Sequence, residues 1–203
     1  MPIRAVIFDW GGVLVRTFDY TSRRKWEARL NLAPGGLEEV VFDSDAARRA
    51  MVGDATETDV WAHAADVFRL APEPLEQLKI DFWSGDQLDE ALVRFLSELR
   101  PQYRTAILSN AWPNAREVLA GRLGLHRAVD TMVISAEERL AKPDERIYRL
   151  AAERLGVRPE EAVFVDDLSV NIDGSRAVGM RGIQFLSREQ AIADVTDCLG
   201  QAT

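Results

Sequence analysis

The sequence predicts an α/β fold, a doubly wound parallel sheet with an inserted helical segment. Three observations support it. Short apolar runs rich in valine and isoleucine recur along the chain, and from residue 103 onward each is followed by apolar residues at helical spacing. Strand alternating with helix is typical of parallel sheets with crossover helices. The stretch from residue 16 to about residue 85 shows helix patterns instead and no comparable strand run.

Five apolar runs predict the strands, at 3–8, 104–108, 129–134 and 162–165, with 181–186 as a fifth candidate. Helix patterns follow the last four runs, as from Ile147 to Leu155, where Gly156 suits a helix end. Lys142 and Pro143 suit the start of that helix, because proline is tolerated in a first turn. The runs are therefore expected to be parallel strands joined by helices.

Three further helix patterns lie between the first and second strands, at 60–68, 75–82 and 88–99. We take the last as the crossover helix of the core. The predicted domains are then a catalytic core of residues 1–15 and 86–203 and a helical cap of residues 16–85. Because the cap follows the first strand, it is expected to stand over the carboxyl end of that strand as a lid.

Composition indicates an ordinary folded chain of 203 residues, 47% apolar and 29% charged. Acidic side chains outnumber basic ones by 33 to 25, and the net charge of −8 repels nucleic acid and anionic membranes, so neither is an expected partner. Cys198, His63 and His126 are too few for a zinc site of the usual ligand count. Without an apolar run of membrane-span length, a cytoplasmic location is expected, and the oligomeric state is left open.

Polar side chains follow three of the predicted strands, where the ligands of a parallel sheet bind. They are Asp9, Ser109, Asn110, Asp166 and Asp167, and Lys142 starts the helix after another strand. Clustered carboxylates without histidine or cysteine suit Mg²⁺, a lysine can neutralise phosphate, and a carboxylate can act as a nucleophile. The residues alone therefore predict metal-assisted phosphoryl transfer.

Four segments resemble the motifs of the haloacid dehalogenase-like hydrolases, in that family's order. They are FDWGGVL at 8–14, LSN at 108–110, AKPD at 141–144 and VFVDDLSVN at 163–171. The resemblance covers the core from residue 3 to about residue 186. It implies a Rossmann-like core, a helical cap after the first motif and a hydrolase activity.

The resemblance also implies roles for individual residues. Asp9 would be the nucleophile and Lys142 the motif lysine, while Ser109 and Asn110 would bind phosphate. Mg²⁺ would be held by Asp9, the carbonyl of Gly11 and Asp167, the second member of the acidic pair. Asp166 would support the site. Asn171 either orients the loop of the acidic pair or caps a helix start.

Gly11 departs from the family pattern, because most phosphatases of the family carry a second aspartate there. That aspartate gives metal its backbone carbonyl and gives the leaving group a proton. Gly11 keeps the first role and loses the second. General acid catalysis is typically worth about 10²- to 10⁴-fold in rate. Substrates with basic leaving groups are therefore expected to react most slowly.

The preferred interpretation is a Mg²⁺-dependent phosphohydrolase acting on a small phosphorylated metabolite through an aspartyl-phosphate. A phosphonate hydrolase is an alternative, since FDWGG resembles that group's first motif, but it needs a cap lysine and only Lys25 and Lys79 are available. A haloacid hydrolase needs no general acid, yet it would not need the acidic pair. A catalytically weakened binding or regulatory protein is the third alternative, which Gly11 favours.

Two sets of cap and loop residues receive structural interpretations. A solvated helix face is expected for Arg23, Arg24 and Lys25. Aromatic core packing is expected for Trp26, Trp61, Trp83 and Trp112.

Overall fold

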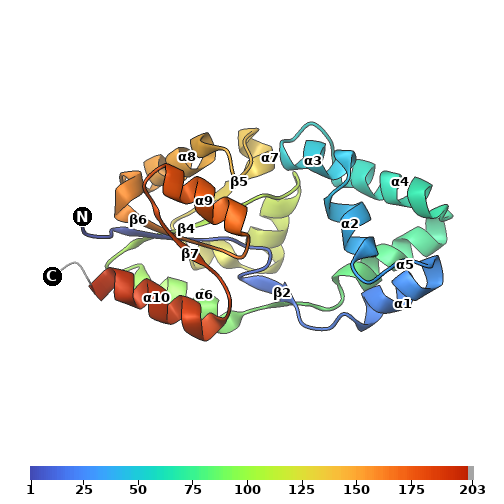
Figure 1. Cartoon of the computed structure of the whole chain (residues 1–203), viewed down its shortest axis with the longest axis horizontal. Helices are drawn as coiled ribbons and strands as arrows, with labels where there is room; N and C mark the ends of the chain where they lie inside the picture. Colours follow the sequence, from blue (N-terminus) through green and yellow to red (C-terminus); the bar gives the residue numbers. More distant parts are fainter. Residues whose placement is uncertain (201–203) are drawn as a thin grey trace.

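A five-stranded parallel sheet forms the centre of the core in the computed structural model, which describes residues 1–200 (Figure 1). The strand order is β5-β4-β1-β6-β7. The strands are β1 (Ala5–Phe8), β4 (Arg104–Ser109), β5 (Thr131–Ile134), β6 (Ala162–Asp166) and β7 (Arg181–Gln184). All five coincide with the predicted apolar runs, and the α/β fold class is confirmed.

Helices cover both faces of this sheet, which explains why its strands are apolar on both sides. Val6 and Phe8 pack on one face with α6 (Glu90–Leu99) and α10 (Arg188–Gly200). Ala5 and Ile7 pack on the other face with α8 (Glu145–Leu155) and α9 (Ser169–Ala177). The shorter helical elements of the core are η1 (Glu117–Arg122), η2 (Leu125–Arg127), α7 (Ser135–Glu138) and η3 (Pro159–Glu161).

Helix α8 begins later than predicted. Asp144 is its N-cap residue, and the Asp144 carboxylate accepts a hydrogen bond of 2.9 Å from the backbone N–H of Arg146. Lys142 and Pro143 therefore precede the helix, and the prediction that they start it was wrong. The Asp144 carboxylate satisfies a first-turn N–H group, which Pro143, the residue directly before it, cannot do.

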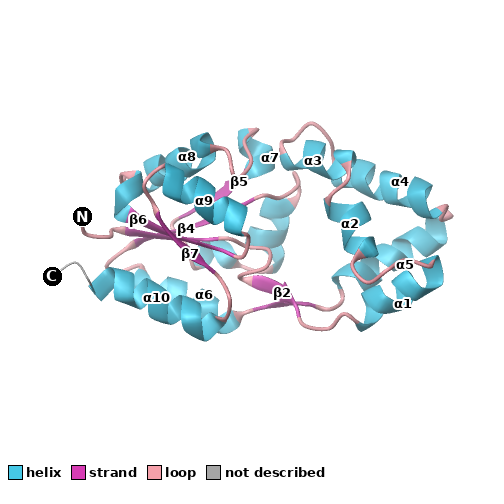
Figure 2. Ribbon diagram, viewed as in Figure 1, coloured by secondary structure: helices cyan, strands magenta, loops and turns pink. Residues whose placement is uncertain are grey.

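The inserted segment consists of helices that lie between β2 (Val15–Thr17) and β3 (Asp86–Leu88) (Figure 2). They are α1 (Thr21–Leu30), α2 (Gly36–Phe42), α3 (Asp45–Met51), α4 (Glu57–Phe68) and α5 (Pro72–Trp83). The insert has an apolar core of its own, in which Leu37, Trp61 and Phe82 are fully buried.

The two ends of the insert are joined by a short antiparallel pair of strands, β2 and β3. Val15 lies opposite Leu88, and Thr17 lies opposite Asp86. The sequence predicts no strand here. Strands of three residues with polar members are too short for the alternation that predicts longer strands.

The insert also touches the core away from this pair of strands. Trp112, in the loop after β4, belongs to the apolar cluster of the insert, with its ring 6.1 Å from that of Phe42 and 6.3 Å from that of Trp83. Asn114 donates a hydrogen bond to Glu57 of α4. The insert therefore lies against the loop that follows the second core strand. Within residues 1–200, no helix combines the length and apolar character needed to cross a membrane.

Candidate active site

Three carboxylates meet where β1 and β6 end. Phe8 pairs with Val165 in parallel register, so Asp9 and Asp166 follow neighbouring strands at the same edge of the sheet. One oxygen from each of Asp9, Asp166 and Asp167 lies within 4.8 Å of the others. Asp9 and Asp166 are buried and Asp167 is half-buried. The sequence-predicted acidic residues are therefore gathered in one cluster.

The ammonium group of Lys142 lies between two of these carboxylates. Its Nζ atom is 2.8 Å from Oδ2 of Asp9 and 2.6 Å from Oδ2 of Asp166. The lysine is 4% exposed, and a charge buried this deeply needs such partners. One ammonium and three carboxylates still leave an excess of negative charge when all are ionised.

Asn110 holds the backbone of Lys142. Its amide donates to the carbonyl of Lys142 at 2.9 Å, and its carbonyl accepts the N–H of Lys142 at 2.8 Å. Ser109 is 2% exposed and ends β4, beside β1, at the edge where Asp9 lies. The predicted phosphate-binding roles of Ser109 and Asn110 stay predictions.

Asn171 lies in the first turn of α9, whose N-cap residue is Leu168. Its side-chain amide donates to Asp166, at 3.0 Å to Oδ1 and 3.1 Å to Oδ2, and the N–H of Leu168 donates to Oδ1 at 2.8 Å. Asp166 is thus held from the α9 side by these donors and from the other side by Lys142.

Gly12 is a residue that the sequence analysis did not single out. Its φ of +78° is in the left-handed region, and a Cβ atom there would lie 2.3 Å from Oδ2 of Asp167. The absent side chain therefore leaves the space that the Asp167 carboxylate occupies. At Gly11, by contrast, an added Cβ would meet nothing within 4 Å. In the sequence, the signal that could have pointed to Gly12 is the glycine pair of FDWGGVL.

Burial and mutual repulsion make the charged form of these carboxylates unfavourable in free energy. Burial raises the pKa of Asp9 to about 7, with Lys142 opposing that shift and Asp166 adding to it. Burial, followed by the charge of Asp166, also raises the pKa of Asp167. A divalent cation would supply the missing positive charge, and a set of carboxylate oxygens without histidine or cysteine suits Mg²⁺.

The basic run of α1 is not the solvated face that was expected. Arg23 is 4% exposed, and its guanidinium donates to Asp86 at 2.9 Å and to the carbonyl of Phe82 at 2.8 Å. The expectation was wrong for Arg23 because its acceptors come from α5 and β3, far away in the sequence. Arg24 and Lys25 are exposed, as expected.

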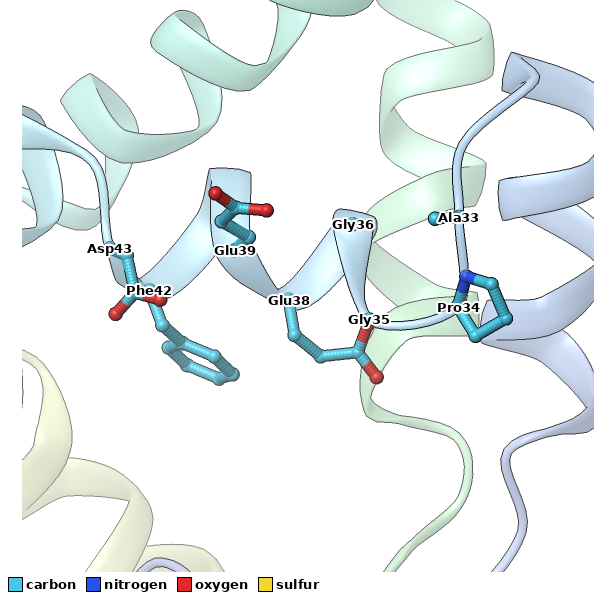
Figure 3. A pocket seen from close by; sticks show the side chains of 8 residues that line it. All are labelled: Ala33, Pro34, Gly35, Gly36, Glu38, Glu39, Phe42 and Asp43. Atoms are coloured by element: carbon cyan, nitrogen blue, oxygen red, sulfur yellow. The ribbon is translucent and has the colours of Figure 1, made fainter.

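A hollow of about 500 Å³ lies beside the acidic helix α2 rather than at the carboxylate cluster (Figure 3). Its lining residues are Ala33, Pro34, Gly35, Gly36, Glu38, Glu39, Phe42 and Asp43. Because these all belong to the insert, the hollow is a feature of the insert and contributes none of the clustered carboxylates.

Comparisons with known proteins give a family match and related sequences. The haloacid dehalogenase-like hydrolase family model matches residues 3–179. Phosphatase MT3486 of Mycobacterium tuberculosis is 27% identical over 89% of this chain and 86% of its own length. Acyl-CoA dehydrogenase family member 10 of Mus musculus is 28% identical over 97% of this chain, which spans only 19% of that relative.

A solved structure has the same fold. The HAD family enzyme of Bacteroides thetaiotaomicron, crystallised in complex with magnesium and inorganic phosphate, matches 92% of this chain and 96% of its own with a TM-score of 0.74 and 18% identity. The family model covers most of the chain, and the ends of the core strands bring together Asp9, Asp166 and Asp167, from the segments that resemble the family's motifs. The chain therefore belongs to the haloacid dehalogenase-like hydrolases.

Proposed function

We propose that this hydrolase is a Mg²⁺-dependent phosphohydrolase acting on a small phosphorylated metabolite. The observation that carries the proposal is the cluster of Asp9, Asp166 and Asp167 with the ammonium of Lys142 between two of them. Such a site presents a carboxylate nucleophile and a fixed positive charge together. Phosphoryl transfer depends mainly on positioning and electrostatic stabilisation of this kind.

In this proposal a carboxylate oxygen of Asp9 attacks phosphorus and the bond from phosphorus to the leaving oxygen breaks, which yields an aspartyl-phosphate and an alkoxide that takes a proton from water to become the alcohol. Water then attacks phosphorus, releases inorganic phosphate and restores the carboxylate. Two donors orient Asp9, since the N–H of Trp10 lies 2.6 Å from Oδ1 and Lys142 lies 2.8 Å from Oδ2. Ser109, Asn110 and Lys142 bind the transferring oxygens.

Asp9, Asp167 and the carbonyl of Gly11 would hold Mg²⁺. When bound, the cation neutralises charge on the phosphoryl oxygens. Asp166, which is paired with Lys142 and Asn171, keeps the lysine in place rather than binding metal. Gly12 keeps room for the Asp167 carboxylate beside the first motif.

Residues 16–85 act in this proposal as a lid over the carboxyl edge of the sheet, and residues 1–15 with 86–203 form the catalytic core. Support comes from the position of the helices between β2 and β3 and from the contact of Trp112 with the aromatic residues of the insert. Closing such a lid excludes water from the reacting groups.

Two observations favour a phosphate ester over the alternatives. A phosphonate hydrolase needs a cap lysine, but Lys25 is exposed on α1 and Lys79 is paired with Glu76 at 2.5 Å. A haloacid hydrolase would not need the acidic pair, Asp166 and Asp167. A relative named as a phosphatase and a structural neighbour crystallised with magnesium and phosphate also support the proposal.

The test is a panel of phosphate monoesters, phosphonates and haloacids, assayed with Mg²⁺ and with a chelator. We expect hydrolysis of phosphate esters that needs Mg²⁺ and is lost in Asp9→Asn, because an amide is a poor nucleophile. Full activity of Asp9→Asn would rule out the mechanism. Hydrolysis of only phosphonates or haloacids would select the corresponding alternative, and activity on none of the three classes would favour a binding protein.

A further inference from the structure

Tyr148 of α8 lies behind the acidic cluster. It is fully buried, and its hydroxyl donates a hydrogen bond of 2.8 Å to the backbone carbonyl of Asn171 in the first turn of α9. Nothing in the four motifs assigns it a role. A buried hydroxyl with a single named acceptor at the base of a site is a candidate for holding that site in place.

The contacts continue from Tyr148 to the charged groups. The side chain of Asn171 donates to both oxygens of Asp166, and Asp166 accepts from Lys142. The ring of Tyr148 packs edge-on against Phe164, at 5.4 Å between centroids, and the ammonium of Lys142 lies 5.4 Å from that same Phe164 ring. Two routes of contact therefore lead from Tyr148 to the lysine and to the acidic pair.

Helix α9 approaches Tyr148 unusually closely at Gly174. A Cβ atom there would lie 3.0 Å from Cε2 of Tyr148 and 2.9 Å from the carbonyl oxygen of Pro143, the residue after Lys142. The absence of a side chain lets α9 pack directly on Tyr148. The hydrogen bond of the Tyr148 hydroxyl and the close approach at Gly174 thus both hold α9 against α8, and the two helices lie side by side (Figure 1).

The hydroxyl remains a donor in the neutral pH range. Burial, followed by the charges of Asp166 and Asp9, raises the pKa of Tyr148 above its ordinary value. The carbonyl of Asn171 therefore keeps this partner throughout the neutral pH range.

We propose that Tyr148 is a positioning residue for the Mg²⁺ site, acting through Asn171. The hydroxyl sets the first turn of α9, from which Asn171 directs Asp166. The orientation of Asp166 in turn fixes the strand end that carries Asp167 toward Asp9. The inference rests on the proposed function, because it concerns the cation that the acidic cluster is proposed to hold.

The variant Tyr148→Phe tests this, because it keeps the buried ring and removes only the hydroxyl. Loss of a group bonded directly to a metal ligand typically costs 10- to 100-fold in metal affinity. Tyr148 acts less directly, through Asn171 and Asp166, so we expect Mg²⁺ binding, measured by titration calorimetry, to weaken by several-fold, up to about tenfold. The KM for a phosphate ester at saturating Mg²⁺ should change less than the Mg²⁺ affinity, because Lys142 is also held by Asp9. The matched control is Tyr103→Phe, which removes a hydroxyl just before β4, at the opposite edge of the sheet.

A second variant shows whether the effect passes through Asn171. In Asn171→Ala the link to Asp166 is already broken, so adding Tyr148→Phe should weaken Mg²⁺ binding no further, whereas independent effects would multiply. Equal Mg²⁺ affinity of the wild-type protein and Tyr148→Phe would overturn the inference, as would an equal loss in Tyr103→Phe or a multiplicative loss in the double variant. Absence of Mg²⁺ binding by the wild-type protein would instead refute the proposed function.

Discussion

Gly12 shows how a single missing side chain shapes the candidate site. The residue has a left-handed backbone, and the space in front of it is filled by the Asp167 carboxylate. A methyl group there would have to displace a proposed metal ligand. Its neighbour Gly11 faces open space, so the two glycines form a natural pair for comparison.

We expect Gly12→Ala to weaken Mg²⁺ affinity by about tenfold or more, since a displaced carboxylate no longer reaches the cation. The left-handed backbone adds a folding cost on the order of 1 kcal/mol. Gly11→Ala serves as the control and should lose much less Mg²⁺ affinity. Titration calorimetry with Mg²⁺ measures both, and equal affinities would show that the Asp167 position is unimportant for binding the cation.

In the proposed mechanism Gly11 supplies no proton to the leaving group. The rate should therefore fall steeply as the leaving alcohol becomes more basic. Gly11→Asp fits the open space and should flatten that dependence, with gains of up to about 10²-fold concentrated on alkyl esters. The measurement is kcat/KM for a series of phosphate esters with both proteins. A shallow dependence in the wild-type protein would mean that another group supplies the proton.

Asp9 makes the stability of the metal-free protein depend on pH. Its folded pKa of about 7 lies above the ordinary value of 3.8, so the folded state binds more protons than the unfolded chain between these values. This stabilisation is complete below pH 4 and is lost as pH rises through 7. The total loss is on the order of 4 kcal/mol.

Urea unfolding with a chelator, at several pH values between 4 and 8, tests this. Asp9→Asn removes the titrating group and should flatten the decline in the free energy of unfolding. Parallel curves for the two proteins would show that Asp9 does not titrate in this range.

At the scale of elements, Arg23 links helices of the insert to the strands β2 and β3, which connect the insert to the core. This guanidinium of α1 bonds Asp86 of β3 and the carbonyl of Phe82, stacks 4.2 Å from the Phe82 ring and lies 3.5 Å from Glu38 of α2. Asp86 also accepts from Thr17 of β2 at 2.6 Å. One buried cation therefore joins α1, α2 and α5 to β3 and, through Asp86, to β2.

Arg23→Ala should destabilise the protein by about 2–4 kcal/mol, because it removes packing on Phe82 and leaves two carboxylates without their cation. Lys25→Ala, two residues away on the exposed side of α1, should change stability by no more than about 0.5 kcal/mol. Thermal or urea unfolding compares the two variants. Similar small effects in both would mean that the Arg23 network is dispensable.

The elements themselves could be predicted where apolar patterns are long. The five core strands appear as apolar runs, since strands covered on both faces must be apolar throughout. The pair β2 and β3 was missed because three-residue strands with Arg16 and Gln87 at their centres carry no such pattern. The start of α8 was misplaced because proline in the segment before the Asp144 cap resembles proline in a first turn.

At the scale of the whole molecule, the candidate site combines predictable and unpredictable parts. Asp9 and Asp166 could be expected to meet, since both end apolar runs and parallel strands align their carboxyl ends. Long-range partners could not be predicted. Asn110 bonds the backbone of Lys142, Arg23 is buried with Asp86 as its partner, and the hydroxyl of Tyr148 bonds the carbonyl of Asn171. None of these contacts has a local sequence pattern.

If residues 16–85 move as a lid, Mg²⁺ with inorganic phosphate should slow hydrogen exchange in the connecting strands, Val15–Thr17 and Asp86–Leu88, because closure orders them. Exchange followed by mass spectrometry, with Mg²⁺ and phosphate each added alone as controls, measures this. Identical protection with and without the pair of ligands would indicate a fixed insert.

The contact of Trp112 with Phe42 and Trp83 has a spectroscopic consequence. Trp112 belongs to the core and its aromatic partners to the insert, so any separation of the two parts exposes its indole to water. Trp26 and Trp61 are buried within the insert and keep their surroundings during such a motion. A red shift of tryptophan emission that persists in Trp83→Phe and disappears in Trp112→Phe would therefore report opening directly, and stopped-flow fluorescence could time it against turnover.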